Sequence, residues 1–140
     1  MNMSIKRFSV GFLAVIAAVV GIWAGFFPLS FHNEFPLPGW GWVSRLGPYN
    51  EHVVRDYGLS NVALLIITTW AWLRPDEKVY RVVGGGRLAY SVIHFIWHML
   101  HLSAFPTVSR VGAVVSLSLI VVFSLLPMLP DRSRRAAEAP

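Results

Sequence analysis

Residues 8–29, FSVGFLAVIAAVVGIWAGFFPL, form an uncharged apolar block. A helix that crosses the hydrocarbon core of a bilayer needs about 20 such residues. Lys6 and Arg7 precede the block, as basic residues precede the apolar part of a signal peptide. The block is long for a signal peptide, however, and no Ala-x-Ala cleavage site follows it. We therefore expect a retained transmembrane helix.

Three further apolar segments predict three more helices, at about 49–73, 88–105 and 108–128. Pro48 suits the first turn of the second helix, and Pro106 separates the last two. The glycines at 84–86 are expected to form a flexible turn, and residues 130–140 a flexible tail. The sequence thus predicts an all-α fold: a four-transmembrane-helix bundle that forms a single domain over residues 1–140.

Composition places the chain in the membrane class and limits its chemistry. Of its 140 residues, 55% are hydrophobic and 14% are charged, with the apolar residues gathered into long blocks. The absence of cysteine excludes thiolate metal sites and disulfides. The net charge of +5 comes from basic residues in the short flanks between apolar blocks. That placement is typical of membrane orientation and argues against nucleic acid as a partner.

The basic residues divide unevenly between the two ends of the predicted bundle. On one side fall Lys6, Arg7, Arg74, Lys78, Arg81, Arg87, Arg132, Arg134 and Arg135; on the other fall Arg45, Arg55 and Arg110. Since cytoplasmic flanks carry the excess of Lys and Arg, both termini are expected in the cytoplasm of a multi-pass membrane protein. The connection between the first two helices then lies outside. Its tryptophans, prolines and glycines predict an ordered loop at the membrane interface.

The first predicted helix also carries small residues at four-residue steps, Ala17, Gly21 and Gly25. Such a face lets another helix approach closely, so we expect it to pack on a neighbour. That neighbour is either within this chain or in another one, as in a homo-oligomer or a non-catalytic subunit of a larger membrane complex.

Three histidines lie in the third predicted helix: His94, His98 and His101, at i, i+4 and i+7 on one face. The predicted topology places them in the outer half of the membrane. It places Glu51, His52 and Asp56, at the start of the second helix, at the same level. Ionisable groups inside a membrane are costly and most often functional.

Helical rise limits what this set of residues can bind. His94 and His101 are about 10 Å apart along the axis, too far to share one ion at bonds of about 2.1 Å. His94 with His98, or His98 with His101, can contribute two nitrogens, and His52, Asp56 or Glu51 can complete the coordination. The sequence therefore predicts a transition-metal site whose ligands suit zinc, copper, iron or manganese equally.

Other readings of the histidines remain open. Two of them, for example His52 and His98, could ligate haem. A metal at this site could perform redox or hydrolytic chemistry on a lipid-soluble substrate. Without a metal, His52 and Asp56 could act on such a substrate as an acid–base pair. Alternatively, the three histidines bind no ligand and form hydrogen bonds to neighbouring polar groups of the protein. The sequence does not decide whether the protein is an enzyme.

Two motifs carry a resemblance. Residues 47–56, GPYNEHVVRD, and the spacing His94-x3-His98-x2-His101 resemble those of a group of small, uncharacterised four-span bacterial integral membrane proteins with GPYNEHxxRD and HxxxHxxH motifs. The resemblance covers most of the chain and implies a four-helix membrane fold, with no established activity.

Overall fold

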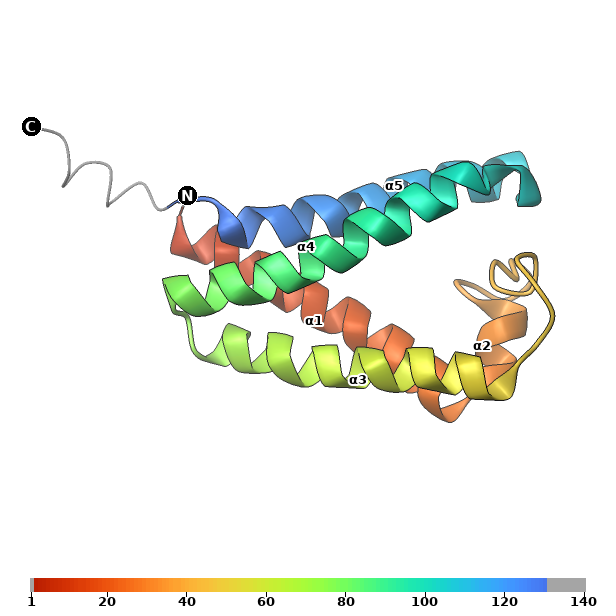
Figure 1. Ribbon diagram of the computed structural model, residues 1–140, viewed down its shortest axis with the longest axis horizontal. Helices are drawn as coiled ribbons and strands as arrows, with labels where there is room; N and C mark the ends of the chain where they lie inside the picture. The colour runs from red at the N-terminus through yellow and green to blue at the C-terminus, as the bar shows by residue number, and fades with distance from the viewer. Residues whose placement is uncertain (1, 131–140) are drawn as a thin grey trace, which may run out of the picture.

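Figure 1 shows a bundle of four long helices, in a computed structural model that describes residues 2–130. The long helices are α1 (Met3–Phe26), α3 (Glu51–Leu73), α4 (Glu77–Leu100) and α5 (Thr107–Leu125); a short helix, α2 (Pro28–Glu34), follows α1, and two 3₁₀ turns are η1 (Leu102–Ala104) and η2 (Leu126–Met128). No strand occurs in the described residues, so the predicted all-α class is confirmed. The tail predicted from residue 130 lies, from residue 131 onward, outside the described residues.

Side-chain caps and prolines set the bounds of the first helices. Asn2 accepts a hydrogen bond from the Ser4 amide at 2.9 Å, so α1 begins five residues before the predicted start at residue 8. It ends before Pro28, which begins α2 and cannot donate a backbone hydrogen bond to continue α1. Asn50 caps α3 in the same way, through the Val53 amide at 3.2 Å.

The predicted turn at residues 84–86 is wrong, because α4 runs unbroken through the three glycines. The helix begins eleven residues before the predicted start at residue 88, where Asp76 accepts hydrogen bonds from the amides of Lys78 and Val79. Gly84 lies against the end of α5: a Cβ there would come within 3.0 Å of Met128 and 3.1 Å of the Ser124 carbonyl oxygen. The glycine therefore serves close helix packing. The regular helix also ends at Leu100, before the predicted end at residue 105.

α1 and α3 pack closely along their length. Ala17, Gly21 and Gly25 are buried in this contact, which confirms the predicted packing face and identifies its neighbour as a helix of the same chain. At the closest point, a Cβ on Gly58 would overlap the backbone of Gly25, and a Cβ on Gly21 would come 2.9 Å from the Val62 amide nitrogen. Backbones approach this closely only where a side chain is missing.

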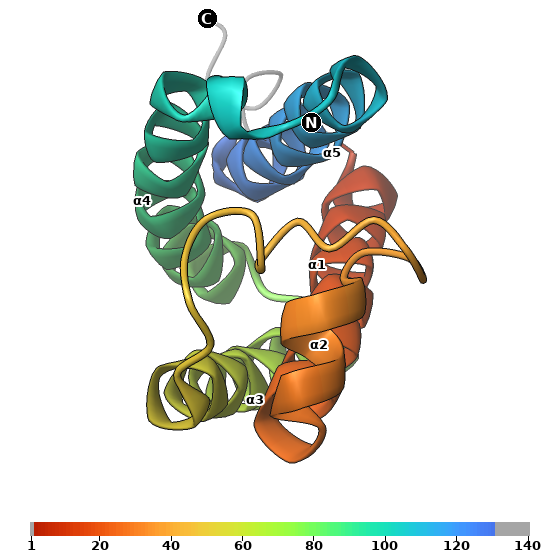
Figure 2. The same ribbon diagram turned by 90° about the vertical axis from the view of Figure 1, so that its right-hand side faces the viewer.

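The second helix pair, α4 and α5, diverges from α3 towards the end of the bundle that carries α2 (Figure 1). The connection of residues 35–50 crosses the space between the two pairs (Figure 2). It is tied to α2, where the His32 Nε2 lies 3.2 Å from the Gly47 carbonyl oxygen, and to α5, where Trp42 contacts Gly112. These contacts hold the loop against α2 and α5.

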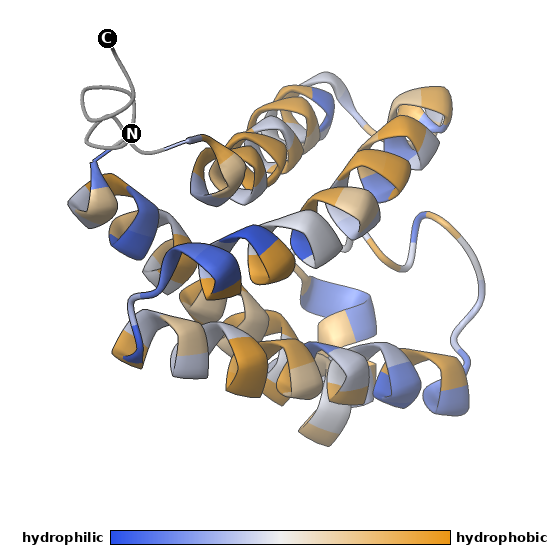
Figure 3. Ribbon diagram, turned by 60° about the vertical axis from the view of Figure 1, so that its left-hand side comes forward, coloured by the Kyte–Doolittle hydropathy of each residue, from blue (hydrophilic) through white to orange (hydrophobic). Residues whose placement is uncertain are grey.

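The opposite end of the bundle, where α1 begins and α5 ends, holds a buried ion pair. The Lys6 Nζ lies 2.8 Å from Glu77 Oε2, and the lysine side chain is fully buried. Arg81 binds the other carboxylate oxygen at 3.0 Å. Elsewhere the helices expose large apolar side chains, for example Ile66, Ile93 and Val111. Figure 3 shows in orange how hydrophobic residues are distributed along these helices.

Two helices are long and apolar enough to cross a membrane: Met3–Phe26 and Thr107–Met128. The described part of α3 and α4 contains more polar and charged residues, and neither helix meets the same criterion of length and hydropathy.

Candidate functional site

The three histidines of α4 do not share one environment. The rings of His94 and His98 lie 4.5 Å apart between centroids, and both line a cavity inside the bundle. His101 is the C-cap of α4 and therefore leaves the helical path. Its ring stacks on Trp97 at 4.0 Å, and its Nδ1–H donates to the Trp97 carbonyl oxygen at 2.7 Å. The structure thus brings together His94 and His98, with His101 turned onto its own helix end.

The predicted ligands on α3 lie elsewhere. His52 Nε2 and Asp56 Oδ2 are 3.3 Å apart, as their i, i+4 spacing predicts, but their side chains are 84% and 61% exposed. Glu51 accepts a hydrogen bond from Arg55 at 2.8 Å. None of these four residues lines the cavity that holds His94 and His98.

Within residues 2–130, no group of three or more His, Asp or Glu side chains is arranged to hold a metal ion. Five of the six predicted ligands form three local arrangements: the His94–His98 pair, the His52–Asp56 pair, and Glu51 with Arg55. The sixth, His101, stacks on Trp97. A metal site that joins α3 to α4 stays a prediction.

The cavity lies between the α1–α3 pair and the α4–α5 pair and has a volume of about 790 Å³. Its walls come from all four long helices, and residues of α2 and the following loop also line it, among them Phe31, Phe35 and Trp42. The lining is mostly apolar. Pockets of about 300–1,000 Å³ with apolar walls and a few polar groups are typical of small-molecule sites.

Most polar groups of the cavity lie on α4 and α3, and Ser116 of α5 adds another. Arg87, Ser91, His94 and His98 follow one another at helical spacing on α4. Tyr57 lines the cavity from α3. His98 Nδ1 is buried and has no hydrogen-bond partner among the described residues. These groups can therefore form hydrogen bonds with a ligand in the cavity, whose lining is otherwise apolar.

Arg87 is the residue that sequence reasoning missed. It was assigned to the cytoplasmic flank, because the helix was expected to begin at residue 88. In the structure it is 3% exposed, and it lines the cavity from within α4. Its place within α4 could have been predicted from Pro75-Asp76-Glu77. A proline followed by a capping residue and an acidic first turn is typical of a helix start, and α4 begins there.

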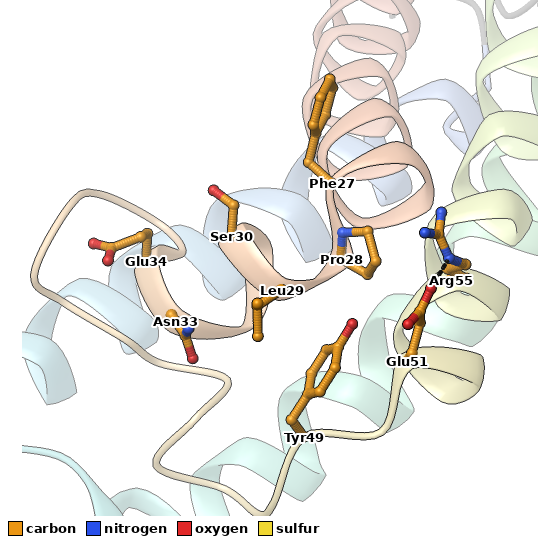
Figure 4. Close-up of a pocket in the computed structure, with 9 residues that line it drawn as sticks. All are labelled: Phe27, Pro28, Leu29, Ser30, Asn33, Glu34, Tyr49, Glu51 and Arg55. Atoms are coloured by element: carbon orange, nitrogen blue, oxygen red, sulfur yellow. Dashed lines mark hydrogen bonds and ion pairs between the residues drawn. The ribbon is translucent and has the colours of Figure 1, made fainter.

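A second hollow lies on the outside of the bundle, between α2 and the start of α3 (Figure 4). Its charged groups are already paired, since Glu51 binds Arg55 and Glu34 accepts a hydrogen bond from the Gly39 amide at 2.7 Å. Arg55 Nη1 also donates to the Gly25 carbonyl oxygen at 2.8 Å. These bonds hold the ends of α1 and α3 together, which gives this hollow a structural role.

Comparison with protein families, with curated proteins and with solved structures finds no match to this chain.

Proposed function

We propose that the chain is a four-span integral membrane protein that binds a lipid-soluble ligand in the cavity between its two helix pairs. The observation that carries this proposal is the cavity itself, which has about 790 Å³ of mostly apolar space with a few polar groups, most of them on α4. Aromatic side chains at its α2 end, such as Trp42 and Trp97, suit a flat or chain-like apolar molecule.

Helix length and surface character support four spans. At about 1.5 Å per residue, the 23 residues of α3 and the 24 of α4 extend about 35 Å, which exceeds a hydrocarbon core of about 30 Å. Large apolar side chains are exposed on α3 and α4 as well as on α1 and α5, for example Ile66 at 66% and Ile93 at 71%. Lipid would cover these faces, which water would not solvate well.

The distribution of charge supports the orientation. Lys6, Arg7, Arg74 and Lys78 lie at the end of the bundle where α1 begins and α3 joins α4. By the positive-inside rule this end faces the cytoplasm of a bacterial cell, and the loop of residues 35–50 lies outside the plasma membrane.

Ligand binding can be tested with two adjacent substitutions on α5. Ser116 lines the cavity, and Val115 is 53% exposed on the outside. The protein would be purified in a mild detergent and titrated with oleyl alcohol, a long-chain apolar probe, with tryptophan fluorescence as the readout. Ser116→Trp fills the cavity and should weaken binding by at least about tenfold, equivalent to about 1.4 kcal/mol. Val115→Trp should leave binding unchanged. Equal binding by both variants would refute the cavity as the site.

A metal ion at His94 and His98 is the second candidate function, because these adjacent rings line the cavity and His98 Nδ1 has no partner among the described residues. A cavity ligand or a rearranged His52 and Asp56 would have to supply the remaining donors. Elemental analysis of purified protein should then find zinc, copper, iron or manganese, which His98→Ala removes. If His52→Ala retains the metal, α3 does not contribute to the site. A Soret band would indicate haem, and metal-free wild-type protein would refute this second candidate.

A further inference from the structure

The cavity holds a buried cation with no counter-charge among residues 2–130. Arg87 is 3% exposed, and neither Nε nor Nη1 has a hydrogen-bond partner in this part of the chain. Burying two guanidinium nitrogens without partners is unfavourable, because they lose their hydration and gain no compensating hydrogen bond. Such a group in a membrane protein is most often part of a binding or transport site.

No carboxylate in the described part of the chain neutralises Arg87. The five acidic residues there all have other partners: Glu34 with the Gly39 amide, Glu51 with Arg55, Asp56 with His52, Asp76 with the amides of Lys78 and Val79, and Glu77 with Lys6 and Arg81. None of them lines the cavity. The residues that line it with Arg87 are apolar or neutral polar groups, apart from the two histidines.

The neighbours of Arg87 are suited to an anionic head group. Tyr90 and Ser91 follow it on the same face of α4, and Tyr57 lines the cavity from α3. Guanidinium groups bind carboxylates through two parallel hydrogen bonds, and hydroxyl groups can donate to the same oxygens. A single arginine matches a single negative charge.

The remaining cavity is suited to an apolar chain. From Arg87 to His98 the cavity wall follows α4 for about 16 Å, at about 1.5 Å per residue. Opposite the polar groups of α4, the lining includes apolar and aromatic side chains of α3 and of the loop of residues 35–50, such as Phe35, Leu46 and Val53. Charge is therefore required at one end of the occupant, and apolar surface over the rest of its length.

We infer that the occupant of the cavity is a single-chain amphiphile with one anionic head group, of the long-chain carboxylate type, whose head group pairs with Arg87. This inference rests on the proposed function, since it assigns the chemical class of the lipid-soluble ligand. The polar wall provides recognition of the head group, and the aromatic end under the loop accommodates the chain.

The test compares two probes that differ only in the head group. Oleate and oleyl alcohol would each be titrated into the full-length protein in a neutral detergent, with sodium acetate as a free-anion probe. The wild type should bind oleate at least about tenfold more tightly than oleyl alcohol, because one buried charge-assisted interaction is added. Acetate alone should bind far more weakly than oleate.

Variants of two arginines on α4 locate the effect. Arg87→Met should abolish the preference for oleate and retain binding of oleyl alcohol, whereas Arg87→Lys should retain part of the preference. Arg81→Met serves as the matched control, since Arg81 is an exposed cation of the same helix and does not line the cavity. The Arg81→Met variant should prefer oleate over oleyl alcohol as strongly as the wild type does. If Arg87→Met does not fold, the wild-type comparison and Arg87→Lys decide the matter.

The outcomes separate this inference from the proposed function. Equal binding of oleate and oleyl alcohol by the wild type, or an unchanged preference in Arg87→Met, overturns the assignment of the head group and leaves the ligand cavity in place. If acetate binds as tightly as oleate, the inference that the ligand is an amphiphile is wrong, and the cavity is a site for a free anion. Failure of both long-chain probes to bind overturns the proposed function, and this inference with it.

Discussion

Gly58 is the position where one added methyl group should weaken the fold most clearly. In a helix interior, replacing glycine by alanine normally stabilises by about 1 kcal/mol. At Gly58, however, the new Cβ would overlap the backbone of Gly25 and come 2.6 Å from the Ala24 carbonyl carbon. Backbone atoms cannot rotate away as a side chain can, so α1 and α3 must separate. Forcing extra atoms into a packed contact costs about 1–3 kcal/mol or more.

The expected net effect of Gly58→Ala is therefore a loss of about 2 kcal/mol, or roughly 5 °C in the unfolding temperature of a chain of this size. Thermal unfolding in detergent, followed by circular dichroism, measures this change. The matched control is Gly86→Ala, since Gly86 is also within a helix and a Cβ there meets nothing within 4 Å. This variant should be stabilised by about 1 kcal/mol.

Two results would refute the reasoning. A Gly58→Ala variant as stable as the wild type would mean that α1 and α3 do not approach as closely as the structure describes. A destabilised Gly86→Ala variant would mean that residues 84–86 need glycine for a turn, which would contradict a continuous α4.

Two further predictions concern the end of the bundle where the chain begins, and the sidedness of the protein. The hydrogen bond from Lys6 lowers the pKa of Glu77 from its ordinary value of 4.5, against the opposing effect of desolvation. The stability that this pair provides is therefore complete above pH 4.5 and is lost as the pH falls through the lowered pKa. Unfolding temperatures measured against pH should show Glu77→Gln less stable than the wild type near neutrality, with a gap that narrows in acid; a gap independent of pH would contradict this. Since the chain has no cysteine, Gly47→Cys should react with an impermeant maleimide on intact cells and Lys78→Cys only after lysis, and the reverse pattern would refute the orientation.

Local sequence signals were enough to predict most helices. The apolar block at 8–29 predicted α1, and Pro48 with the following polar turn predicted α3 to within two residues of its start. Glycine was the source of the main error. Three consecutive glycines are typical of a turn when only the sequence is considered, but Gly84 is needed because the end of α5 passes close to it. That requirement is tertiary, and no local pattern contains it.

The candidate site was predictable only within single helices. The i, i+4 spacing correctly placed His94 beside His98, and His52 beside Asp56. The prediction that His101 shares a helix face with His94 and His98 was wrong, because α4 ends at Leu100 and His101 leaves the helical path. Whether residues of α3 and α4 meet depends on how far the two helices diverge. That angle follows from the α1–α3 and α4–α5 contacts, so the cavity and Arg87 could not be derived from sequence spacing.

The separation of α3 from α4 has a consequence for how a ligand would reach the cavity. The loop of residues 35–50 crosses the outer end of the bundle, held to α2 at Gly47 and to α5 at Trp42. In the proposed membrane arrangement, the cavity residues of α3 and α4, such as Tyr57 and Tyr90, would lie at the depth of the acyl chains, so a ligand could reach them from the bilayer. A ligand that enters this way partitions into the membrane first and diffuses sideways into the protein. Its occupancy would follow its mole fraction among the lipids, and its concentration in water would matter only through that partition.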